Sequence, residues 1–132
     1  MNELNFAEET LTRMKALYDL AGDHEGIRRT VVSRLYYAAH HLSRLLLRKS
    51  GLRTETWRKN VHQRVIGELG RRFAATGRMD SEVFAFLDTM RRLRVQADYE
   101  LRQVIPESDV ENMFELFNAY FGECKRLLGR MI

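Results

Sequence analysis

The chain contains 132 residues, of which 45% are hydrophobic and 30% charged, with one proline, one cysteine and a formal net charge of +4. This composition is typical of a single soluble globular domain over residues 1–132, and it excludes a fibrous, disordered or low-complexity protein. The lone cysteine excludes an internal disulfide and a zinc site built from several cysteines.

The spacing of apolar residues predicts five helices and no strand. A first helix is expected over residues 5–21, with Asn5 and Glu8 at the spacing of a capping box. The second helix is expected to begin after Asp23, a residue suited to cap a helix, and to end at Ser50. A helix of this length would measure on the order of 40 Å at 1.5 Å per residue. We therefore expect it to be the central strut of the domain.

Three more helices are predicted after an irregular segment over residues 52–59. Residues with capping or helix-terminating chemistry mark their boundaries: Asn60 and Gly77 for the third helix, Asp80 and Pro106 for the fourth, and Ser108 with Glu111 for the start of the fifth. The apolar face of the fourth helix is expected to extend as far as Leu101. Together these segments predict an all-α, up-and-down bundle of about five helices.

The second helix carries two different faces between Thr30 and Arg48. Its apolar face should point into the core and consists of Val31, Leu35, Ala38, Leu42 and Leu45. The other face combines hydroxyl, guanidinium, phenol and imidazole groups, where a solvated face would carry more Glu and Lys. These groups form the first part of a candidate site, which consists of Ser33, Arg34, Tyr37, His41 and Arg44, with Arg48 one turn further on.

Positive charge is concentrated around this helix. Residues 25–59 contain nine basic and two acidic residues, which give a net charge of +7. Arginine accounts for 18 of the 22 basic residues in the chain, and its planar guanidinium suits bidentate contacts with phosphate or carboxylate. Two interpretations of this charge are equally open: an anion-binding surface, or an arginine-rich surface that is simply solvated.

The fourth helix supplies the second part of the candidate site. Arg94 and Asp98 are four residues apart, so they lie on one face of the helix and can form an ion pair. If the pair only solvates the helix, it is worth a few tenths of a kcal/mol. If instead Asp98 orients Arg94, the guanidinium is positioned to bind an anion.

No motif for metal or nucleophilic chemistry accompanies these residues. The histidines at 24, 40, 41 and 62 occur in no HExxH pattern, and His40 and His41 diverge by about 100° on a helix. Glycine-rich phosphate loops are absent from the sequence, and none of the serines lies in a nucleophile elbow. We therefore expect neither a metal ion nor a cofactor.

The N-terminal residues do not resemble a secretory signal, because Glu3, Glu8 and Glu9 lie where a signal peptide needs a basic and then an apolar run. No apolar run in the sequence approaches the length of a membrane span. The single Cys124 suits a reducing compartment. These features predict a cytoplasmic protein.

Three segments resemble the HEPN domains, a family of small all-helical prokaryotic proteins. Residues 33–41, SRLYYAAHH, are similar to the family signature SRxYYAxFH, with His40 where a phenylalanine is usual and His41 at the family's histidine position. Residues 62–73 resemble the third helix of the family, and residues 94–99 resemble its RxxADY signature. The order and spacing of the segments match over nearly the whole chain.

This resemblance implies a bundle of about five helices, a homodimer, and a minimal nucleotidyltransferase made beside it in a two-protein module. Some relatives are metal-independent endoribonucleases, the toxins of toxin–antitoxin pairs, whose site is an arginine followed after four to six residues by a histidine. Here Tyr99 occupies the position at which the family's histidine would follow Arg94, and no histidine occurs after His62. Because a phenol titrates near 10 and an imidazole near 6.5, this departure argues against ribonuclease activity.

Three interpretations of function remain open. The first is a non-catalytic module in which the candidate site forms a groove that binds a nucleotide, RNA or the nucleotidyltransferase partner. Tyr99 is included among the residues of this groove. The second is a metal-independent endoribonuclease toxin in which His41 or Tyr99 replaces the missing imidazole. The third is a structural helical dimer without a ligand, in which the tyrosines and histidines only pack. The first requires the polar face of the second helix to meet Arg94 and Asp98 across one hollow.

Overall fold

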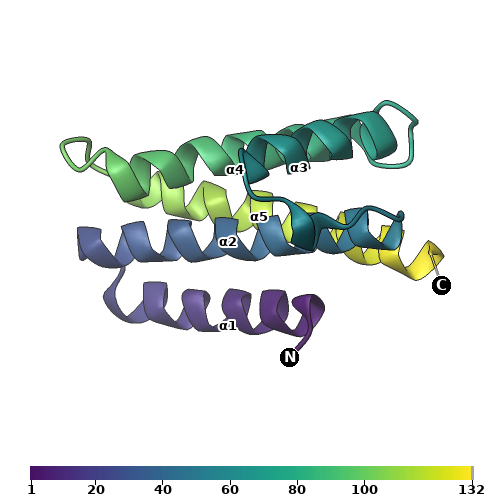
Figure 1. The fold of residues 1–132 in the computed structure, drawn as a ribbon. Coiled ribbons are helices and arrows are strands. Elements are labelled where there is room, and N and C mark those ends of the chain that lie inside the picture. The colour runs from purple at the N-terminus through teal and green to yellow at the C-terminus, as the bar shows by residue number, and fades with distance from the viewer. Residues whose placement is uncertain (132) are drawn as a thin grey trace.

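The computed structural model describes residues 1–131 and is an all-helical bundle (Figure 1). In chain order its elements are α1 (Glu3–Ala21), α2 (Glu25–Lys49), the 3-10 turn η1 (Thr54–Thr56), α3 (Val61–Leu69), the π-helical turn η2 (Gly70–Ala74), α4 (Ser81–Tyr99) and α5 (Glu107–Arg130). The predicted all-α fold with five helices is confirmed. Within residues 1–131, no helix combines the length and apolar character needed to cross a membrane.

Helix α2 is the centre of the bundle. At 25 residues it is the longest element, and it contacts all four other helices. Most of its predicted apolar face is fully buried, including Val31, Leu35 and Leu42, whereas Leu45 is only partly buried. With neighbours on several sides, α2 leaves one polar strip uncovered, and this strip carries the candidate site.

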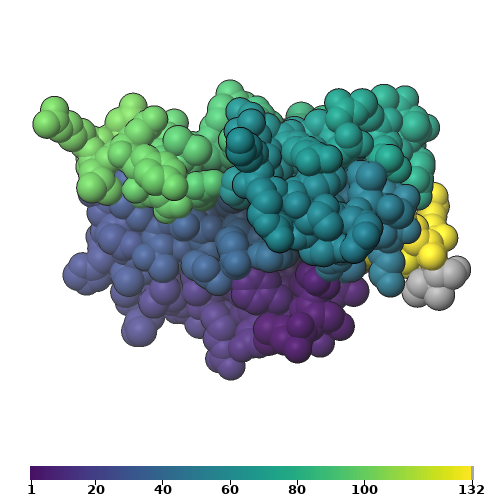
Figure 2. Space-filling model, viewed as in Figure 1, coloured from purple at the N-terminus to yellow at the C-terminus, as the bar shows by residue number. Residues whose placement is uncertain are grey.

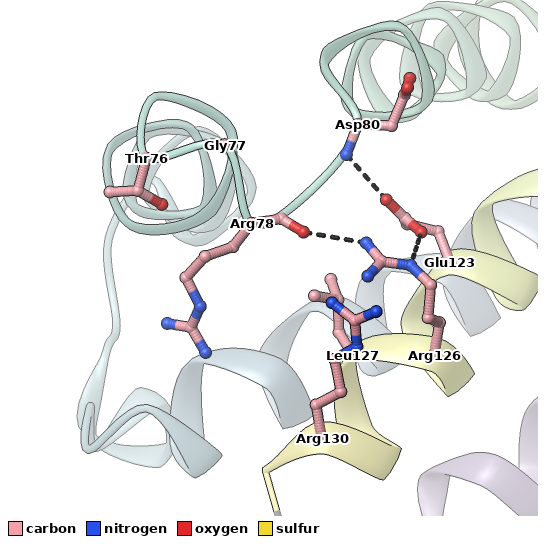
Figure 3. A pocket seen from close by; sticks show the side chains of 8 residues that line it. All are labelled: Thr76, Gly77, Arg78, Asp80, Glu123, Arg126, Leu127 and Arg130. Carbon is pink, nitrogen blue, oxygen red and sulfur yellow. Dashed lines mark hydrogen bonds and ion pairs between the residues drawn. The ribbon is translucent and has the colours of Figure 1, made fainter.

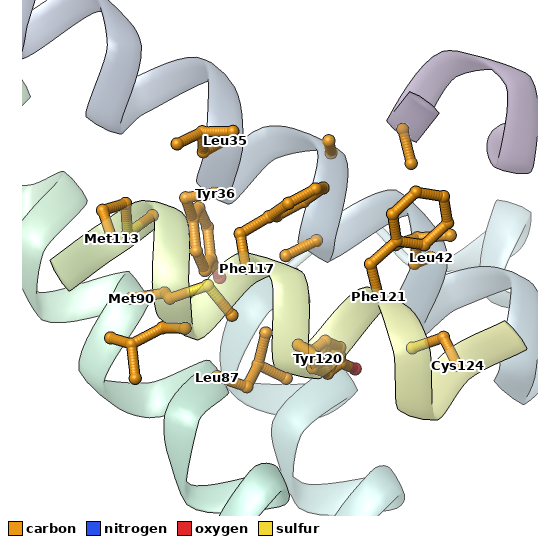
Figure 4. Packing of buried hydrophobic residues seen from close by; sticks show 14 of the residues in the cluster. Leu35, Tyr36, Leu42, Leu87, Met90, Met113, Phe117, Tyr120, Phe121 and Cys124 are labelled. Carbon is orange, nitrogen blue, oxygen red and sulfur yellow. The ribbon is translucent and has the colours of Figure 1, made fainter. Parts of the chain in front are cut away.

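Helix α5 packs against α2 and α4 and buries a cluster of apolar side chains between them, as the close-up of this cluster shows (Figure 4). Phe117 and Phe121 lie with their ring centroids 5.7 Å apart. Leu42 of α2 and Met90 of α4 belong to the same cluster and are fully buried. Burial of each such side chain stabilises the fold by about 1.5–3 kcal/mol. The hydrophobic packing of α2, α4 and α5 therefore fixes the relative positions of the helices that carry the site.

One polar contact crosses this core. The hydroxyl oxygens of Ser43 and Tyr120 lie 2.5 Å apart, and the Ser43 hydroxyl also donates to the carbonyl oxygen of Ala39 at 2.8 Å. Both side chains are fully buried, and because the Ser43 proton is already donated to Ala39, the Tyr120 hydroxyl donates to Ser43 and so has a partner away from water. Cys124 lies buried one turn further along α5.

The first two helices begin at different caps from those predicted. The side chain of Asn2 accepts a hydrogen bond from the backbone N–H of Asn5 at 2.8 Å, so α1 begins at Glu3 and the predicted cap at Asn5 is wrong. In α2 the cap position is occupied by His24, which makes no side-chain cap hydrogen bond, so the prediction of Asp23 is also wrong. At the start of α1, Asn2 and Asn5 have the same side chain, so the sequence alone did not distinguish between them.

Asn60 and Asp80 both occupy the predicted cap positions, but only Asp80 accepts a cap hydrogen bond, from the backbone N–H of Val83 at 3.0 Å. Asn60 precedes α3 with a left-handed backbone (φ 52°) and makes no side-chain cap hydrogen bond. The capping box predicted at Ser108 is wrong, because α5 has already begun and Pro106 occupies the cap position. Proline is favoured beside a helix start because it has no N–H to leave unpaired.

The third helix was predicted to run to Gly77, but its α-helical part ends at Leu69 and continues as a π-helical turn to Ala74. At Gly70 an added Cβ atom would lie 3.2 Å from the ring of Phe84, so a glycine permits the close approach of α4. Gly77 then adopts a positive φ of 77° in the turn that leads to α4.

This turn is fastened to α5 beside a hollow of about 620 Å³ (Figure 3). Arg126 forms an ion pair with Glu123 at 2.6 Å and donates to the carbonyl oxygen of Arg78 at 2.9 Å. Glu123 also accepts from the backbone N–H of Asp80 at 2.7 Å. These polar groups satisfy one another, and we assign them a structural role.

The C-terminal end of α4 is held by an arginine of α2. The guanidinium of Arg29 donates to the carbonyl oxygens of Gln96 at 3.0 Å and Ala97 at 2.9 Å, and it pairs with Glu25 at 2.9 Å. The helix ends at Tyr99, and the segment that follows projects from one end of the molecule (Figure 2). Leu101 was predicted to be buried on α4, but it lies in this segment and is 73% exposed.

Candidate functional site

A hollow of about 290 Å³ lies between α2, α3 and α4, and we call it the polar hollow. Its lining residues are Ser33, Arg34, Tyr36, Tyr37, His40, His41, Arg44, His62, Arg94 and Asp98. Seven of the residues that the sequence assigned to the candidate site are among them, and Arg48 and Tyr99 are not. The polar face of α2 and the arginine–aspartate pair of α4 therefore share one concave surface.

Arg94 is positioned from several sides within this hollow. Its side chain is only 14% exposed and pairs with Asp98 at 3.6 Å. Asp98 in turn accepts a hydrogen bond from the hydroxyl of Ser33 at 3.2 Å, which connects α4 to α2. The guanidinium carbon lies 5.2 Å from the ring centroid of Tyr36, within the range of a cation–π contact. A side chain held in this way is not an ordinary solvated surface arginine.

His62 of α3 faces Arg94 across the hollow. Its Nε2 atom lies 3.5 Å from the Arg94 guanidinium, and its Nδ1 atom lies 3.0 Å from the hydroxyl of Tyr36. Because a guanidinium can only donate, Nε2 is the acceptor, so the ring proton is on Nδ1 and is donated to the tyrosine oxygen. The lone pair of a neutral imidazole is thereby directed at Arg94, whose side chain is only 14% exposed.

The three histidines of the hollow remain neutral at pH 7. Burial lowers the pKa of His40 to about 3, and the neighbouring His62, whose ring centroid is 4.2 Å away, adds to this effect. Burial also lowers the pKa of His62, assisted by the positive charge of Arg94. The pKa of His41 is lowered by burial and by Arg44. The lining therefore carries three arginine charges against the single carboxylate of Asp98.

Arg34 lies at the outer rim of the hollow. Its guanidinium carbon is 4.6 Å from the ring centroid of Tyr37, and within residues 1–131 it forms no ion pair. Tyr37 is 43% exposed, and its ring meets that of His41 edge-on at a centroid distance of 4.4 Å. The rim thus offers a free positive charge beside an accessible aromatic ring.

Arg44 lies at the inner end of the hollow. It donates to the carbonyl oxygen of Thr54 at 2.9 Å, which ties the segment after α2 to the hollow. Its Nε atom is buried and has no hydrogen-bond partner among residues 1–131. Arg48, one turn further along the same face, pairs with Glu3 of α1 at 2.5 Å and does not line the hollow. The available basic groups of the site are therefore Arg34, Arg44 and Arg94.

Tyr99 was also predicted for the site and, like Arg48, lies outside the hollow. It is the last residue of α4 and is 71% exposed. The guanidinium carbon of Arg94 is 5.8 Å from its ring centroid, so the two side chains are neighbours on the helix surface. Five residues along a helix exceed one turn by about 140°, which directs Tyr99 away from the face that Arg94 and Asp98 share.

Three lining residues were not assigned to the site from the sequence: Tyr36, His40 and His62. A signal for the first two was present, because they follow Ser33 at steps of three and four residues and so lie on the same side of α2. No local pattern predicted that His62 would face Arg94, because this contact depends on how α3 is placed against α4.

Among residues 1–131, no group of three or more His, Cys, Asp or Glu side chains is arranged to hold a metal ion. Comparisons of the chain with protein-family models, with curated proteins and with solved structures find no match.

Proposed function

We propose that this protein is a non-catalytic binding module that takes the phosphate group of a nucleotide, or of an RNA backbone, in the polar hollow. The observation that carries the proposal is the excess of positive charge in one small concavity, where Arg34, Arg44 and Arg94 face a single carboxylate. Arginine binds phosphate through two parallel N–H donors. Neutral histidines and tyrosines among the arginines add hydrogen-bonding groups without adding negative charge.

Each basic group has a distinct part in this proposal. Arg94 is fixed by Asp98 and by the Tyr36 ring, so little side-chain freedom is lost when it binds an anion. Arg34 is exposed and forms no ion pair within residues 1–131, so it can close over a bound phosphate. The accessible ring of Tyr37 offers a surface on which a base can stack.

The direct test is a titration of the protein with a nucleotide and with a short single-stranded RNA. Arg94→Ala should raise the dissociation constant at least about tenfold, because hydrogen bonds to charged groups are worth about 1.5–3 kcal/mol. Arg92→Ala is the matched control, since Arg92 is on the same helix, has a side chain that is 71% exposed, pairs with Asp88 and does not line the hollow. Absent binding, or binding that is insensitive to salt and to Arg94→Ala, would overturn the proposal.

The contact between Arg94 and His62 supports a second candidate, a metal-independent endoribonuclease. In such a reaction Arg94 would turn from His62 to the phosphate, which frees the lone pair of Nε2 to take the proton from a ribose 2′-hydroxyl, whose oxygen attacks the adjacent phosphorus. The 5′-oxygen would leave and take a proton from solvent, while Arg94 stabilises the charge on the phosphate. Of the two bases considered from the sequence, Tyr99 lies outside the hollow and His41 lines it.

This second candidate is tested by incubating RNA with the purified protein in the presence of a chelator. Cleavage that His62→Ala abolishes, and that His41→Ala leaves in place, would assign the base to His62. Loss of cleavage in His41→Ala alone would assign it to His41. Intact RNA after incubation with the wild-type protein would exclude the candidate and leave the binding module.

The resemblance to HEPN proteins extends the proposal to partners. It predicts a homodimer and a minimal nucleotidyltransferase partner, whereas the third interpretation is a structural dimer without a ligand. The exposed apolar side chains of Tyr99, Leu101 and Val104, which lie close together in sequence, support a protein contact at that end of α4. Light scattering of the purified chain, alone and with a nucleotidyltransferase encoded beside it, tests both partners. A monomer that binds RNA would reject the structural dimer.

A further inference from the structure

A second, less polar hollow of about 270 Å³ adjoins the polar hollow, and we call it the aromatic hollow. It lies between the start of α1 and the middle of α2, and its lining residues are Met1, Asn2, Glu3, Phe6, Tyr37 and His41. Tyr37 and His41 line both hollows, so their rings form the partition between them. A ligand that passes over this partition would contact both hollows at once.

The walls of the aromatic hollow are suited to a flat ring. Phe6 lies edge-on to Tyr37 at a centroid distance of 5.8 Å and edge-on to His41 at 6.0 Å. Arg34, which lines the neighbouring polar hollow, has its guanidinium carbon 5.8 Å from the ring centroid of Phe6 and 4.6 Å from that of Tyr37. Bases stack on aromatic and guanidinium planes of this kind, largely without regard to sequence.

One acidic group gives the aromatic hollow a negative charge, whereas the polar hollow is positively charged. Glu3 lines it and accepts a hydrogen bond from Arg48 at 2.5 Å through one oxygen. Burial raises the pKa of this carboxyl, but hydrogen bonds from its own backbone N–H and from Arg48 lower it by more, so Glu3 is ionised at pH 7. A carboxylate has about four lone-pair sites, so Glu3 can accept further hydrogen bonds.

We infer that the two hollows together bind one nucleotide, with its base in the aromatic hollow and its 5′-phosphate in the polar hollow, and that guanine is the preferred base. The inference rests on the proposed function, because it uses the same phosphate site and adds a base site to it. The sugar lies over Tyr37 and His41, the two residues that the hollows share. The arginines of the polar hollow thus suit the phosphate, and the carboxylate of Glu3 suits the N–H donors of the base.

The preference for guanine follows from Glu3. The Watson–Crick edge of guanine presents two adjacent N–H donors, N1–H and the exocyclic N2 amino group, and an ionised carboxylate can accept both. Adenine and cytosine present one amino group beside an acceptor nitrogen, which would face the carboxylate unfavourably. Uracil presents a single N–H between two carbonyl oxygens. Glu3 therefore selects for guanine, while stacking on Phe6 holds any base.

The test compares ligands that contain one or both halves of the nucleotide, by calorimetric titration of the full chain. GMP should bind at least tenfold more tightly than ribose 5-phosphate, which lacks the base, and at least fivefold more tightly than AMP. In Glu3→Gln the dissociation constants of GMP and AMP should differ by no more than about twofold. Phe6→Leu should weaken the affinity for GMP at least fivefold and change the affinity for ribose 5-phosphate less than twofold. Tyr18→Leu, on the same helix but beside Phe114 of α5, is the matched control and should leave both affinities unchanged.

The outcomes separate this inference from the proposed function. Equal affinities for GMP and ribose 5-phosphate, both weakened by Arg94→Ala, would overturn the base site and leave the phosphate site intact. A preference for GMP over AMP that persists in Glu3→Gln would overturn the role of Glu3. If no phosphate compound binds, or if Arg94→Ala changes nothing, the proposed function fails and the base site fails with it. Thermal unfolding of each variant confirms that an affinity change does not reflect a lost fold.

Discussion

The guanidinium of Arg94 lies 3.5 Å from Nε2 of His62, although 32 residues separate them in the chain. The contact joins α3 to α4 at the wall of the polar hollow. It also fixes the tautomer of His62, because an arginine can only donate a hydrogen bond. A positive charge thus lies against a neutral imidazole, with room beside both for an anion.

Salt dependence tests whether Arg94 contacts phosphate. Binding of single-stranded RNA weakens with salt because counterions are released, with a slope of about −0.7 in log K against log salt for each phosphate neutralised. Arg94→Ala should therefore reduce the magnitude of the slope by about 0.7. Measurement of RNA affinity at four salt concentrations gives the slope. Arg92→Ala should leave it unchanged, and an equal slope in both variants would contradict a direct phosphate contact.

Acid should destabilise the fold through the histidines of the hollow. An unfolded histidine titrates near 6.5, whereas burial lowers the pKa of His40 to about 3 in the folded chain. Below pH 6.5 the unfolded chain binds a proton that the folded chain does not, so stability falls as the pH falls. Through His40 alone, the free energy of unfolding should fall by about 2 kcal/mol between pH 7.5 and 5. His41 and His62 add to this loss.

Urea unfolding of the wild type and of His40→Phe at several pH values measures this effect. The variant should lose less stability than the wild type between pH 7.5 and 5, because phenylalanine fills a similar volume and does not titrate. His24 has a side chain that is 74% exposed, so His24→Gln should leave the wild-type profile unchanged. Parallel profiles for the wild type and His40→Phe would show that His40 is protonated in the folded chain as well.

The buried hydroxyl pair provides a test of the core. Tyr120→Phe removes the partner of Ser43, which keeps its hydrogen bond to the Ala39 carbonyl. The expected loss in free energy of unfolding is about 1 kcal/mol, the net value of one such hydrogen bond. Urea unfolding measures the loss, with Tyr99→Phe at the exposed end of α4 as the control. An unchanged midpoint in Tyr120→Phe would mean that the contact adds nothing to stability.

Arg29 should contribute more to the stability of the fold than any surface arginine does. Arg29→Ala leaves the carbonyl groups of Gln96 and Ala97 without their donor and removes the partner of Glu25. The loss should be about 3 kcal/mol, against less than about 0.5 kcal/mol for exposed Arg92→Ala. Arg29→Lys should recover only part of this stability, because one ammonium group cannot reach several carbonyls in a fixed plane. Thermal unfolding ranks the three variants, and equal midpoints for Arg29→Ala and Arg92→Ala would refute this role.

Helical periodicity was enough to predict the helices and most of the core face of α2, because burial follows a pattern of 3.6 residues that the sequence displays directly. The same pattern separated the polar residues that share a side of α2, from Ser33 to Arg44. Capping positions were less predictable, since Asn2 and Asn5 have the same chemistry and only the folded chain distinguishes them.

The rest of the site depends on contacts between distant segments. His62 was not predicted to be part of the site because the rotation of α3 against α4 is set by packing over its whole surface, not by its own sequence. Arg29 presents the same difficulty, because its acceptors are backbone carbonyls 67 and 68 residues away, which carry no side-chain signature. Tyr99 was included because of its position after Arg94, but the helix turns it to another side.

The buried position of Cys124 makes the protein convenient to label. This is the only cysteine of the chain, and burial raises the pKa of its thiol, so the reactive thiolate is scarce at neutral pH. A maleimide dye should therefore react with a cysteine introduced at the surface, such as Arg92→Cys, while the native thiol stays unmodified. A single fluorophore on α4 could then report ligand occupancy in real time, with the natural core left intact.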